Sequence, residues 1–227
     1  MNIKILAFDA DDTLWHNESY FQEIEKEFCE LLEDYLPQHS ISKELFKTEM
    51  QNMELYGYGV KAFMLSMIET ALRISEKSLK LDDIEMIIGL GKGLLAKPVE
   101  NLDHVQEVLT ELGKKYRLVM ATKGDLLDQE RKLGKSGLEN FFHHIEIVSE
   151  KNETNFRKLV KHLDIRPEEF GMIGNSLKSD IIPVLNIGGY GFHVPYHVLW
   201  DHEKIEHKVE HPNLIQLEKL RDILQHL

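Results

Sequence analysis

The segment Asp9-Ala10-Asp11-Asp12-Thr13 places three carboxylates within four residues. It follows Ile3 to Phe8, a short and nearly continuous apolar run that is typical of a strand buried on both faces. Two carboxylates at a spacing of two, just beyond a strand, can project into one cleft if the chain turns there. A hard cation such as Mg²⁺ suits them, because it takes oxygen ligands and relieves their repulsion. Asp9 is then placed for in-line attack on phosphorus, and Asp11 for proton transfer.

The sequence beyond Pro98 alternates between strand and helix patterns. Such alternation predicts a doubly wound parallel sheet with helices on both faces, an α/β fold of the Rossmann-like type. The expected strands cover residues 117–121, 145–148, 170–173 and 190–194, and the expected helices cover residues 99–114, 126–134, 153–163 and 179–186. The tail from residue 213 to residue 227 is one more amphipathic stretch.

Polar residues follow three of these strands, and ligands of open α/β sheets bind beyond the carboxyl ends of strands. Thr122 and Lys123 follow the first, and at the start of a helix they offer hydrogen bonds and backbone N–H groups to a phosphate. Lys151 could neutralise charge on Asp9 and on a transferring phosphoryl group. Asn175 and Asp180 supply further oxygens for a metal ion or its waters.

Each signal taken alone has a structural explanation. Asp-x-Asp is common in turns, a threonine after a strand is often a helix cap, and Lys151 lies in a run of charged residues. The joint occurrence of these residues in a fixed order, each at the end of an expected strand, favours one catalytic cleft.

The segment between the first strand and Pro98 has a purely helical pattern. We expect helices over residues 18–36, 42–55, 61–74 and 81–95, with Ser42 as a cap and with Gly89, Gly91 and Gly93 interrupting the last helix as a hinge or breaker. The predicted domains are therefore an α/β core, residues 1–16 plus 97–227, and an inserted all-helical domain, residues 17–96. Trp15 to Glu18 are expected to line the mouth of the cleft.

The order Asp9-x-Asp11-x-Thr13, Thr122, Lys151 and Gly174-Asn175-Ser176 with Asp180 resembles the four motifs of the haloacid dehalogenase-like hydrolases. The resemblance covers nearly the whole chain, and the helical insertion resembles the first type of cap in that family. It implies Asp9 as the nucleophile, Asp11 as general acid and base, and Thr122 and Lys151 as stabilisers of phosphate and intermediate. It also implies Mg²⁺ bound by Asp9, the backbone carbonyl of Asp11 and the fourth motif, which contains Asn175 and Asp180.

Two positions refine what the resemblance implies. The dehalogenase branch lacks an acid at the position of Asp11 and uses no metal, so Asp11 favours phosphate chemistry. The fourth motif usually begins with aspartate, and this chain has Asn175 there. Asparagine keeps the ligand oxygen and loses the charge, which should weaken magnesium binding unless Asp180 compensates.

The composition narrows the class of partner. A formal net charge of −12 argues against nucleic acid and anionic membrane surfaces as general partners, whereas a metal ion can reverse the field inside a cleft. The single cysteine, Cys29, excludes an intrachain disulfide, and no apolar stretch approaches the roughly 20 residues of a membrane span. We therefore expect a soluble, cytoplasmic enzyme that acts on a small phosphorylated metabolite.

The leading hypothesis is a Mg²⁺-dependent phosphohydrolase that forms an aspartyl-phosphate on Asp9. A phosphosugar mutase or a phosphonate hydrolase would use the same family of folds, and the latter generally places a cap lysine near the substrate. The cap offers four lysines, none in a telling context: Lys61, Lys77, Lys80 and Lys92. A third hypothesis is a catalytically weakened ligand-binding member whose metal site Asn175 has spoiled.

Overall fold

The computed structural model describes residues 1–227, and the chain forms two compact units. One contains residues 1–18, 99–123 and 129–227; the other contains residues 19–98 and 124–128. None of the helices combines the length and the apolar character needed to cross a lipid bilayer.

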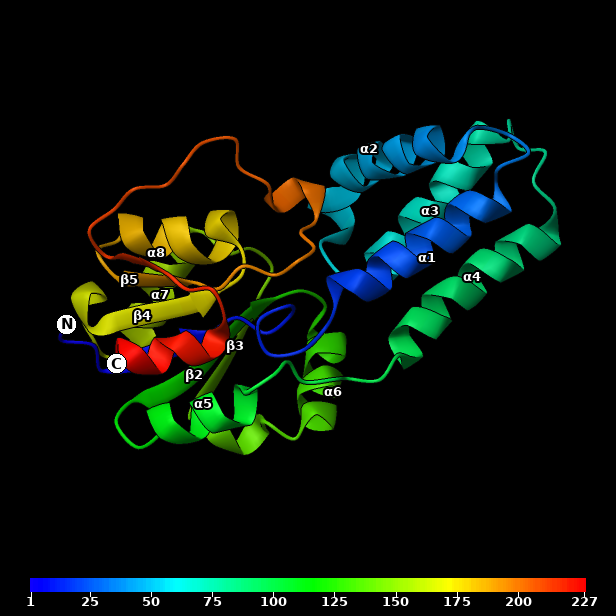
Figure 1. Ribbon diagram of the computed structural model, residues 1–227. Coiled ribbons are helices and arrows are strands. Elements are labelled where there is room, and N and C mark those ends of the chain that lie inside the picture. The colour runs from blue at the N-terminus through cyan, green and yellow to red at the C-terminus, as the bar shows by residue number, and fades with distance from the viewer. The chain divides into compact units, whose positions relative to one another are not determined.

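The first unit is built on a six-stranded parallel sheet with strand order β3-β2-β1-β4-β5-β6 (Figure 1). This confirms the predicted α/β, doubly wound fold. The strands are β1 (Ile5–Phe8), β2 (Arg117–Lys123), β3 (His144–Val148), β4 (Phe170–Gly174), β5 (Tyr190–His193) and β6 (Leu214–Gln216). Because β1 lies between β2 and β4, the residue that follows it stands near the middle of the sheet's carboxyl edge.

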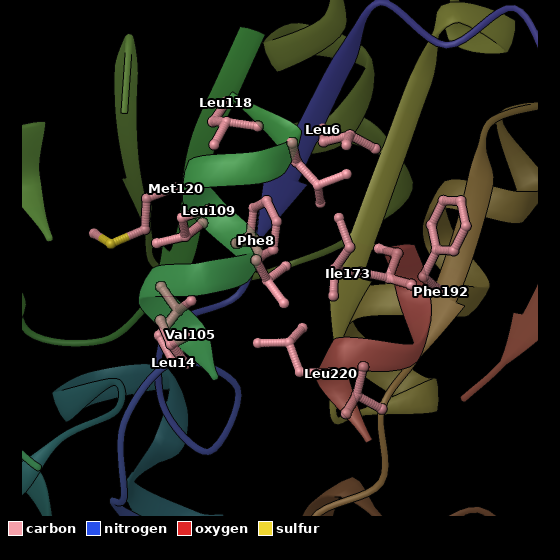
Figure 2. Close-up of a cluster of buried hydrophobic side chains, with 14 of the residues drawn as sticks. Leu6, Phe8, Leu14, Val105, Leu109, Leu118, Met120, Ile173, Phe192 and Leu220 are labelled. Atoms are coloured by element: carbon pink, nitrogen blue, oxygen red, sulfur yellow. The ribbon is translucent and has the colours of Figure 1, made fainter. Parts of the chain in front are cut away.

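Alternate residues of β1 explain why helices cover both faces of this sheet. Leu6 and Phe8 pack with α5 (Val105–Leu112) and the 3₁₀ turn η5 (Leu220–Gln225), as Figure 2 shows for the labelled side chains. On the other face, Ile5 and Ala7 pack with side chains of α7 (Glu153–His162) and α8 (Ile182–Asn186). The remaining helix of the α/β part is α6 (Leu126–Ser136), with a π-helical turn η3 (Leu177–Ile181) and short 3₁₀ turns η1 (Glu139–Phe141), η2 (Pro167–Glu169) and η4 (Asp201–Glu203).

The second unit consists mainly of four helices around its own apolar core. They are α1 (Glu18–Leu31), α2 (Gln38–Tyr56), α3 (Val60–Ile74) and α4 (Leu81–Ala96), coloured blue to green in Figure 1. Side chains from all four meet in one cluster that includes Phe28, Leu45, Met67 and Ile87. Cys29 belongs to the same cluster and forms no disulfide.

Two expectations about these helices were wrong. Helix α2 begins at Gln38, directly after Pro37, because proline fixes φ at a value compatible with a helix start; Ser42 is therefore inside the helix and donates to Glu25 instead of capping. Helix α4 runs without interruption through its three glycines. Gly91 is needed for close packing, because a Cβ there would lie 2.6 Å from the sulfur of Met64.

Three boundaries in the α/β part also differ from expectation. Strand β2 extends to Lys123, so Thr122 is within the strand and four residues before α6 rather than at the start of a helix. Helix α5 begins only at Val105, after His104 in the left-handed conformation. The tail contains a sixth strand, β6, whose three residues are too few to give a period.

Candidate active site

The carboxyl ends of four neighbouring strands position the expected site residues. The N–H of Asp9 donates to the carbonyl of Ile173 in β4 (2.8 Å), which continues the pairing of β1 one residue past its end. Thr122 is the penultimate residue of the adjacent β2 and is 1% exposed, while Lys151 follows β3 and Asn175 follows β4. The chain turns after Asp9 because Asp12 takes a left-handed φ of 61°, which aspartate tolerates better than most residues.

The Asp9 carboxylate is buried against a lysine. Lys151 Nζ contacts Asp9 Oδ1 and also lies 2.6 Å from Asp180 Oδ1, and the side chain of Lys151 is only 2% exposed. One ammonium group thus serves two buried carboxylates. Burial, with Asp180 as the next cause, raises the pKa of Asp9 to about 7 despite the opposing effect of Lys151. Burial alone would lower the pKa of Lys151, but Asp180 and Asp9 outweigh it and raise that pKa.

Thr13 brings the first and fourth motifs together. Its hydroxyl lies 3.1 Å from Asp9 Oδ2 and 3.4 Å from Asn175 Oδ1, and it accepts a hydrogen bond from the N–H of Asn175 (3.1 Å). The carboxylate of the fourth motif belongs to Asp180, and both of its oxygens accept hydrogen bonds. Oδ2 accepts from the N–H of Ser176 (3.0 Å), and Oδ1 accepts from Lys151. Asp180 thus meets Asp9 at Lys151, whereas the side-chain oxygen of Asn175 meets Asp9 Oδ2 at the hydroxyl of Thr13.

Asp11 has a separate set of partners. Its Oδ1 accepts from Trp15 Nε1 (2.7 Å) and Lys132 Nζ (2.7 Å), and its Oδ2 accepts from Gln129 Nε2 (2.8 Å) and again from Lys132 (2.8 Å). Trp15 is fully buried, so the expectation that it lines the mouth of the cleft was wrong. An indole N–H needs a partner when it is buried, and Asp11 provides it.

The carboxylate of Asp12 binds backbone N–H groups and not the other side chains of the site. Its carboxylate accepts from the N–H groups of Asn17 (2.9 Å) and Glu18 (3.0 and 3.1 Å), the orphan donors at the start of α1. Burial and the nearby Asp11 raise the pKa of Asp12 to about 7. The three carboxylates of the first motif, Asp9, Asp11 and Asp12, thus have three different environments.

Lys123 forms an ion pair that the sequence did not indicate. Its Nζ contacts Glu203 and lies 2.9 Å from Ser179 Oγ, so a phosphate at this position would compete with both. Glu203 also accepts from the hydroxyls of Ser176 and Ser179. Burial would raise the pKa of Glu203, but Lys123 and the two hydroxyls lower it to about 2.

Sequence reasoning missed Gln129, Lys132 and Glu203. The first two share one face of α6 at a spacing of three, a signal that could have drawn attention because α6 follows the second motif. Glu203 lies in a short turn between β5 and β6 with no periodic pattern around it, so only the tertiary structure identifies it.

No group of three or more histidine, cysteine, aspartate or glutamate side chains in the chain is arranged to hold a metal ion. Metal ligation at the strand ends would therefore depend on amide, carbonyl and water oxygens in addition to Asp9.

Comparison with known proteins gives consistent results. The family model described as haloacid dehalogenase-like hydrolase matches residues 3–188. The crystal structure of a haloacid dehalogenase-like family hydrolase from Xanthomonas campestris superposes with a TM-score of 0.89 at 37% identity, covering 97% of this chain and 88% of that one.

Two curated relatives have phosphatase names. N-acylneuraminate-9-phosphatase of Mus musculus is 33% identical over 91 residues, 38% of this chain, and the match spans little more than a third (37%) of that protein's length. Glyceraldehyde 3-phosphate phosphatase of Methanothermobacter thermautotrophicus is 25% identical over 200 residues, which cover 82% of this chain and 83% of that protein. By sequence and by structure, the chain belongs to the haloacid dehalogenase-like hydrolases.

Proposed function

We propose that the protein is a Mg²⁺-dependent phosphohydrolase that cleaves a small phosphomonoester through an aspartyl-phosphate on Asp9. The observation that carries the proposal is the position of Asp9, a carboxylate at the end of the central strand with Lys151 on one oxygen and Thr13 on the other. Phosphatase names among the relatives support a phosphate ester as the substrate.

Asp9 attacks phosphorus with one carboxylate oxygen, and the P–O bond to the leaving group breaks in line with the bond that forms. Lys151 neutralises charge on Asp9 and on the equatorial phosphate oxygens. The hydroxyl of Thr122, near the end of the neighbouring strand, donates a hydrogen bond to the phosphate. Lys123 assists only when it exchanges Glu203 for a phosphate oxygen.

Asp11 acts as general acid and then as general base. It gives a proton to the leaving oxygen in the first step, and in the second it takes one from the water that attacks the aspartyl-phosphate. Its side chain is 23% exposed, so unlike Asp9 it retains access to solvent.

The donor set suits Mg²⁺. Asp9 Oδ2 and Asn175 Oδ1 converge on the same hydroxyl, and the carbonyl of Asp11 accepts no backbone hydrogen bond. Two buried carboxylates, Asp9 and Asp180, share one lysine, so a further cation would relieve their repulsion. Mg²⁺ is usually held by one or two carboxylates with several waters, and here it would be held by Asp9, the Asp11 carbonyl and Asn175, with Asp180 acting through Lys151 and Ser176. When bound, it would offset the negative charge of the phosphate and of the nucleophile.

We propose that the helical insertion, residues 17–96, acts as a cap and that residues 1–16 plus 97–227 form the catalytic core. Lys61 does not favour the phosphonate hydrolase, because it is 2.8 Å from Asp125 and already paired. Buried Cys29 is consistent with a reducing compartment, so we place the enzyme in the cytoplasm.

The test uses purified protein and 4-nitrophenyl phosphate, with Mg²⁺ or with EDTA. We expect phosphate release only with Mg²⁺, and a loss of at least about 1000-fold in Asp9→Asn, because the amide is not a nucleophile. Asp103→Asn, at an exposed position of the same unit, is the matched control and should stay within about twofold of wild type, as expected for a surface change. Release that persists in EDTA or in Asp9→Asn would overturn the proposal.

A ligand-binding member with a spoiled metal site is distinguished by calorimetry with MgCl₂. Binding accompanied by no turnover over a broad panel of phosphomonoesters would favour that alternative over an enzyme.

A further inference from the structure

Glu203 is a buried charge in a segment that otherwise lies at the surface. It belongs to the stretch between β5 and β6, and between Val194 and Leu217 it is the only buried residue. Apolar side chains usually anchor such a stretch, because burying a carboxylate is costly unless the carboxylate is paired and hydrogen-bonded. A charged anchor therefore indicates that particular partners require it.

Three side chains donate to the Glu203 carboxylate. Lys123 Nζ lies 2.5 Å from Oε1, and the buried hydroxyls of Ser176 and Ser179 lie 2.5 and 2.6 Å from Oε2. Lys123 is the last residue of β2, whereas the two serines follow β4, and β1 lies between these two strands. Glu203 thus joins two parts of the carboxyl edge that the sheet does not pair directly.

Both serines lie inside the fourth-motif turn, residues 174–180. Ser176 follows Asn175, and its N–H donates to Asp180 Oδ2 (3.0 Å). The hydroxyl of Ser176 also accepts from the N–H of Ser179 (3.0 Å) at the start of the π-helical turn η3. Turns of this kind are rare and are frequent at functional sites. The two hydroxyls that contact Glu203 therefore belong to the same turn as Asn175 and Asp180.

Asn175 depends on the conformation of this turn more than a charged ligand would. Its amide oxygen attracts a cation more weakly than a carboxylate does, so its contribution depends on how well it is held in place. The N–H of Asn175 donates to Thr13 Oγ1 (3.1 Å), and its carbonyl oxygen lies 3.0 Å from His193 Nε2. These contacts hold the first part of the turn, and Glu203 holds the later part through Ser179.

We propose that Glu203 is a positioning residue that holds the fourth-motif turn in the conformation in which Asn175 can bind Mg²⁺. The inference rests on the proposed function, because the metal site is part of it. Glu203→Gln keeps one acceptor oxygen and replaces the other with an NH₂ group, which cannot accept. Either Lys123 or the two serine hydroxyls then lose their acceptor. The substitution therefore loosens the turn without changing Asn175 itself.

Glu169 offers a matched control at the opposite end of β4. It is 4% exposed and directly precedes the strand, and its carboxylate accepts from Lys4 Nζ (2.7 Å) and from the N–H of Arg166 (3.0 Å). Glu169→Gln is therefore the same chemical change, at a buried carboxylate of the same unit, but at the amino end of the strand. A glutamate that only supports the fold would behave as Glu169 does.

The experiment titrates the full chain with MgCl₂ in a calorimeter, and urea denaturation measures the stability of each variant. For Glu203→Gln we expect Mg²⁺ binding about tenfold weaker than in wild type, as for other residues that orient metal ligands. Glu169→Gln should lose stability but bind Mg²⁺ within about twofold of wild type, because it is distant from the metal site. In the 4-nitrophenyl phosphate assay, Glu203→Gln should need about tenfold more Mg²⁺ for half its maximal rate and keep kcat at saturating Mg²⁺ within about threefold of wild type.

Ser179→Ala is the second variant, and it leaves the pair of Lys123 and Glu203 in place. It removes one of the two hydroxyls on Glu203, so we expect Mg²⁺ binding about threefold weaker. Ser136→Ala is its control and should bind Mg²⁺ as wild type does. Ser136 is a buried serine of the same unit, and its hydroxyl donates to the carbonyl of Leu133 (2.7 Å).

Wild-type Mg²⁺ affinity in Glu203→Gln or in Ser179→Ala would overturn the inference, and so would an equal loss of affinity in the matched control. If Glu203→Gln does not fold, Ser179→Ala and its control decide the question. A wild-type protein that binds no Mg²⁺ would instead overturn the metal site of the proposed function, and the inference with it.

Discussion

Asp9 and Asp11 are two residues apart, and their carboxylates have contrasting surroundings. Around Asp9 the site is closed: Lys151 is 2% exposed, it is shared with Asp180, and the pKa of Asp9 is raised to about 7 by burial and by Asp180. Around Asp11 the site is partly open, and its carboxylate accepts from Lys132 and from the two neutral donors Trp15 and Gln129.

The contrast separates two tasks within one motif. The closed side has more negative charge than its single cation neutralises, which suits a place where Mg²⁺ and a phosphate are to be accommodated. The open side has a fixed orientation and access to solvent, which suits proton transfer. Adjacency in sequence therefore does not give these carboxylates the same role.

The largest expected effect comes from removing the lysine on the closed side. Lys151→Met leaves Asp9 and Asp180 buried without a cation, and we expect the free energy of unfolding to fall by about 3–5 kcal/mol at pH 8 in EDTA. Urea denaturation measures it. Lys132→Met on the open side should cost less than about 1 kcal/mol.

Adding Asp180→Asn to Lys151→Met removes one of the unpaired charges and should restore at least half of the lost stability. If the two lysine variants were equally stable, the distinction between a closed and an open side would fail.

The second prediction concerns pH. In metal-free protein, the pKa of Asp9 rises from 3.8 to about 7 on folding, so the folded state binds more protons than the unfolded state between these values. Stability should therefore fall as pH rises from about 4 to 7, by up to about 1.4 kcal/mol per pH unit for one carboxyl group. Burial raises the pKa of Asp12 to about 7 and that of Glu49 to about 8, so both contribute in the same window.

Urea denaturation in EDTA at a series of pH values tests this. Asp9→Asn should lower the slope by roughly a third, since it removes one of the three groups. A slope of the opposite sign, or one that Asp9→Asn leaves unchanged, would show that Asp9 is not a buried, under-neutralised carboxylate.

Glu203→Gln tests a third buried ion pair, the one between Lys123 and Glu203. It leaves Lys123 without its ion pair, and we expect a loss of about 1–3 kcal/mol at pH 7, less than for a fully buried pair. Because the pKa of Glu203 is lowered from 4.5 to about 2 in the folded protein, its contribution is complete above pH 4.5 and is lost as pH falls toward 2. The difference from wild type in urea denaturation should narrow in that range. The exposed Glu206→Gln is the control and should show no such pH dependence.

The smallest effect is expected at Asp12. Asp12→Ala removes the acceptor for the N–H groups of Asn17 and Glu18, and should lower stability by about 1 kcal/mol while kcat/KM stays within about threefold of wild type. Thermal unfolding and the 4-nitrophenyl phosphate assay measure the two quantities. A large loss of activity with normal stability would place Asp12 in the chemistry, contrary to its contacts.

The sequence was sufficient where a feature depends on local pattern. Apolar runs ending in polar residues identified the main strands of the sheet, and the order of Asp9, Thr122, Lys151 and Asn175 followed from those strand ends. The helical period also identified the four helices of the second unit.

It was insufficient where a feature depends on which surfaces meet. The need for glycine at position 91 of α4 depends on Met64 of another helix, which a Cβ there would meet. Gln129 and Lys132 lie 118 and 121 residues from Asp11 in sequence, and Glu203 lies 80 residues from Lys123. No periodic pattern encodes such distant pairs.

Chemical trapping tests the central claim most directly. The protein is mixed with a rapidly hydrolysed phosphomonoester and Mg²⁺, quenched in acid, and treated with borohydride, which reduces an acyl phosphate but not a free carboxylate. Peptide mass spectrometry then locates the reduced residue. We predict homoserine at position 9 and at no other aspartate, and none when Mg²⁺ is replaced by EDTA. Homoserine at another position, or none at position 9 under conditions in which phosphate is released with a measured burst, would contradict Asp9 as the nucleophile.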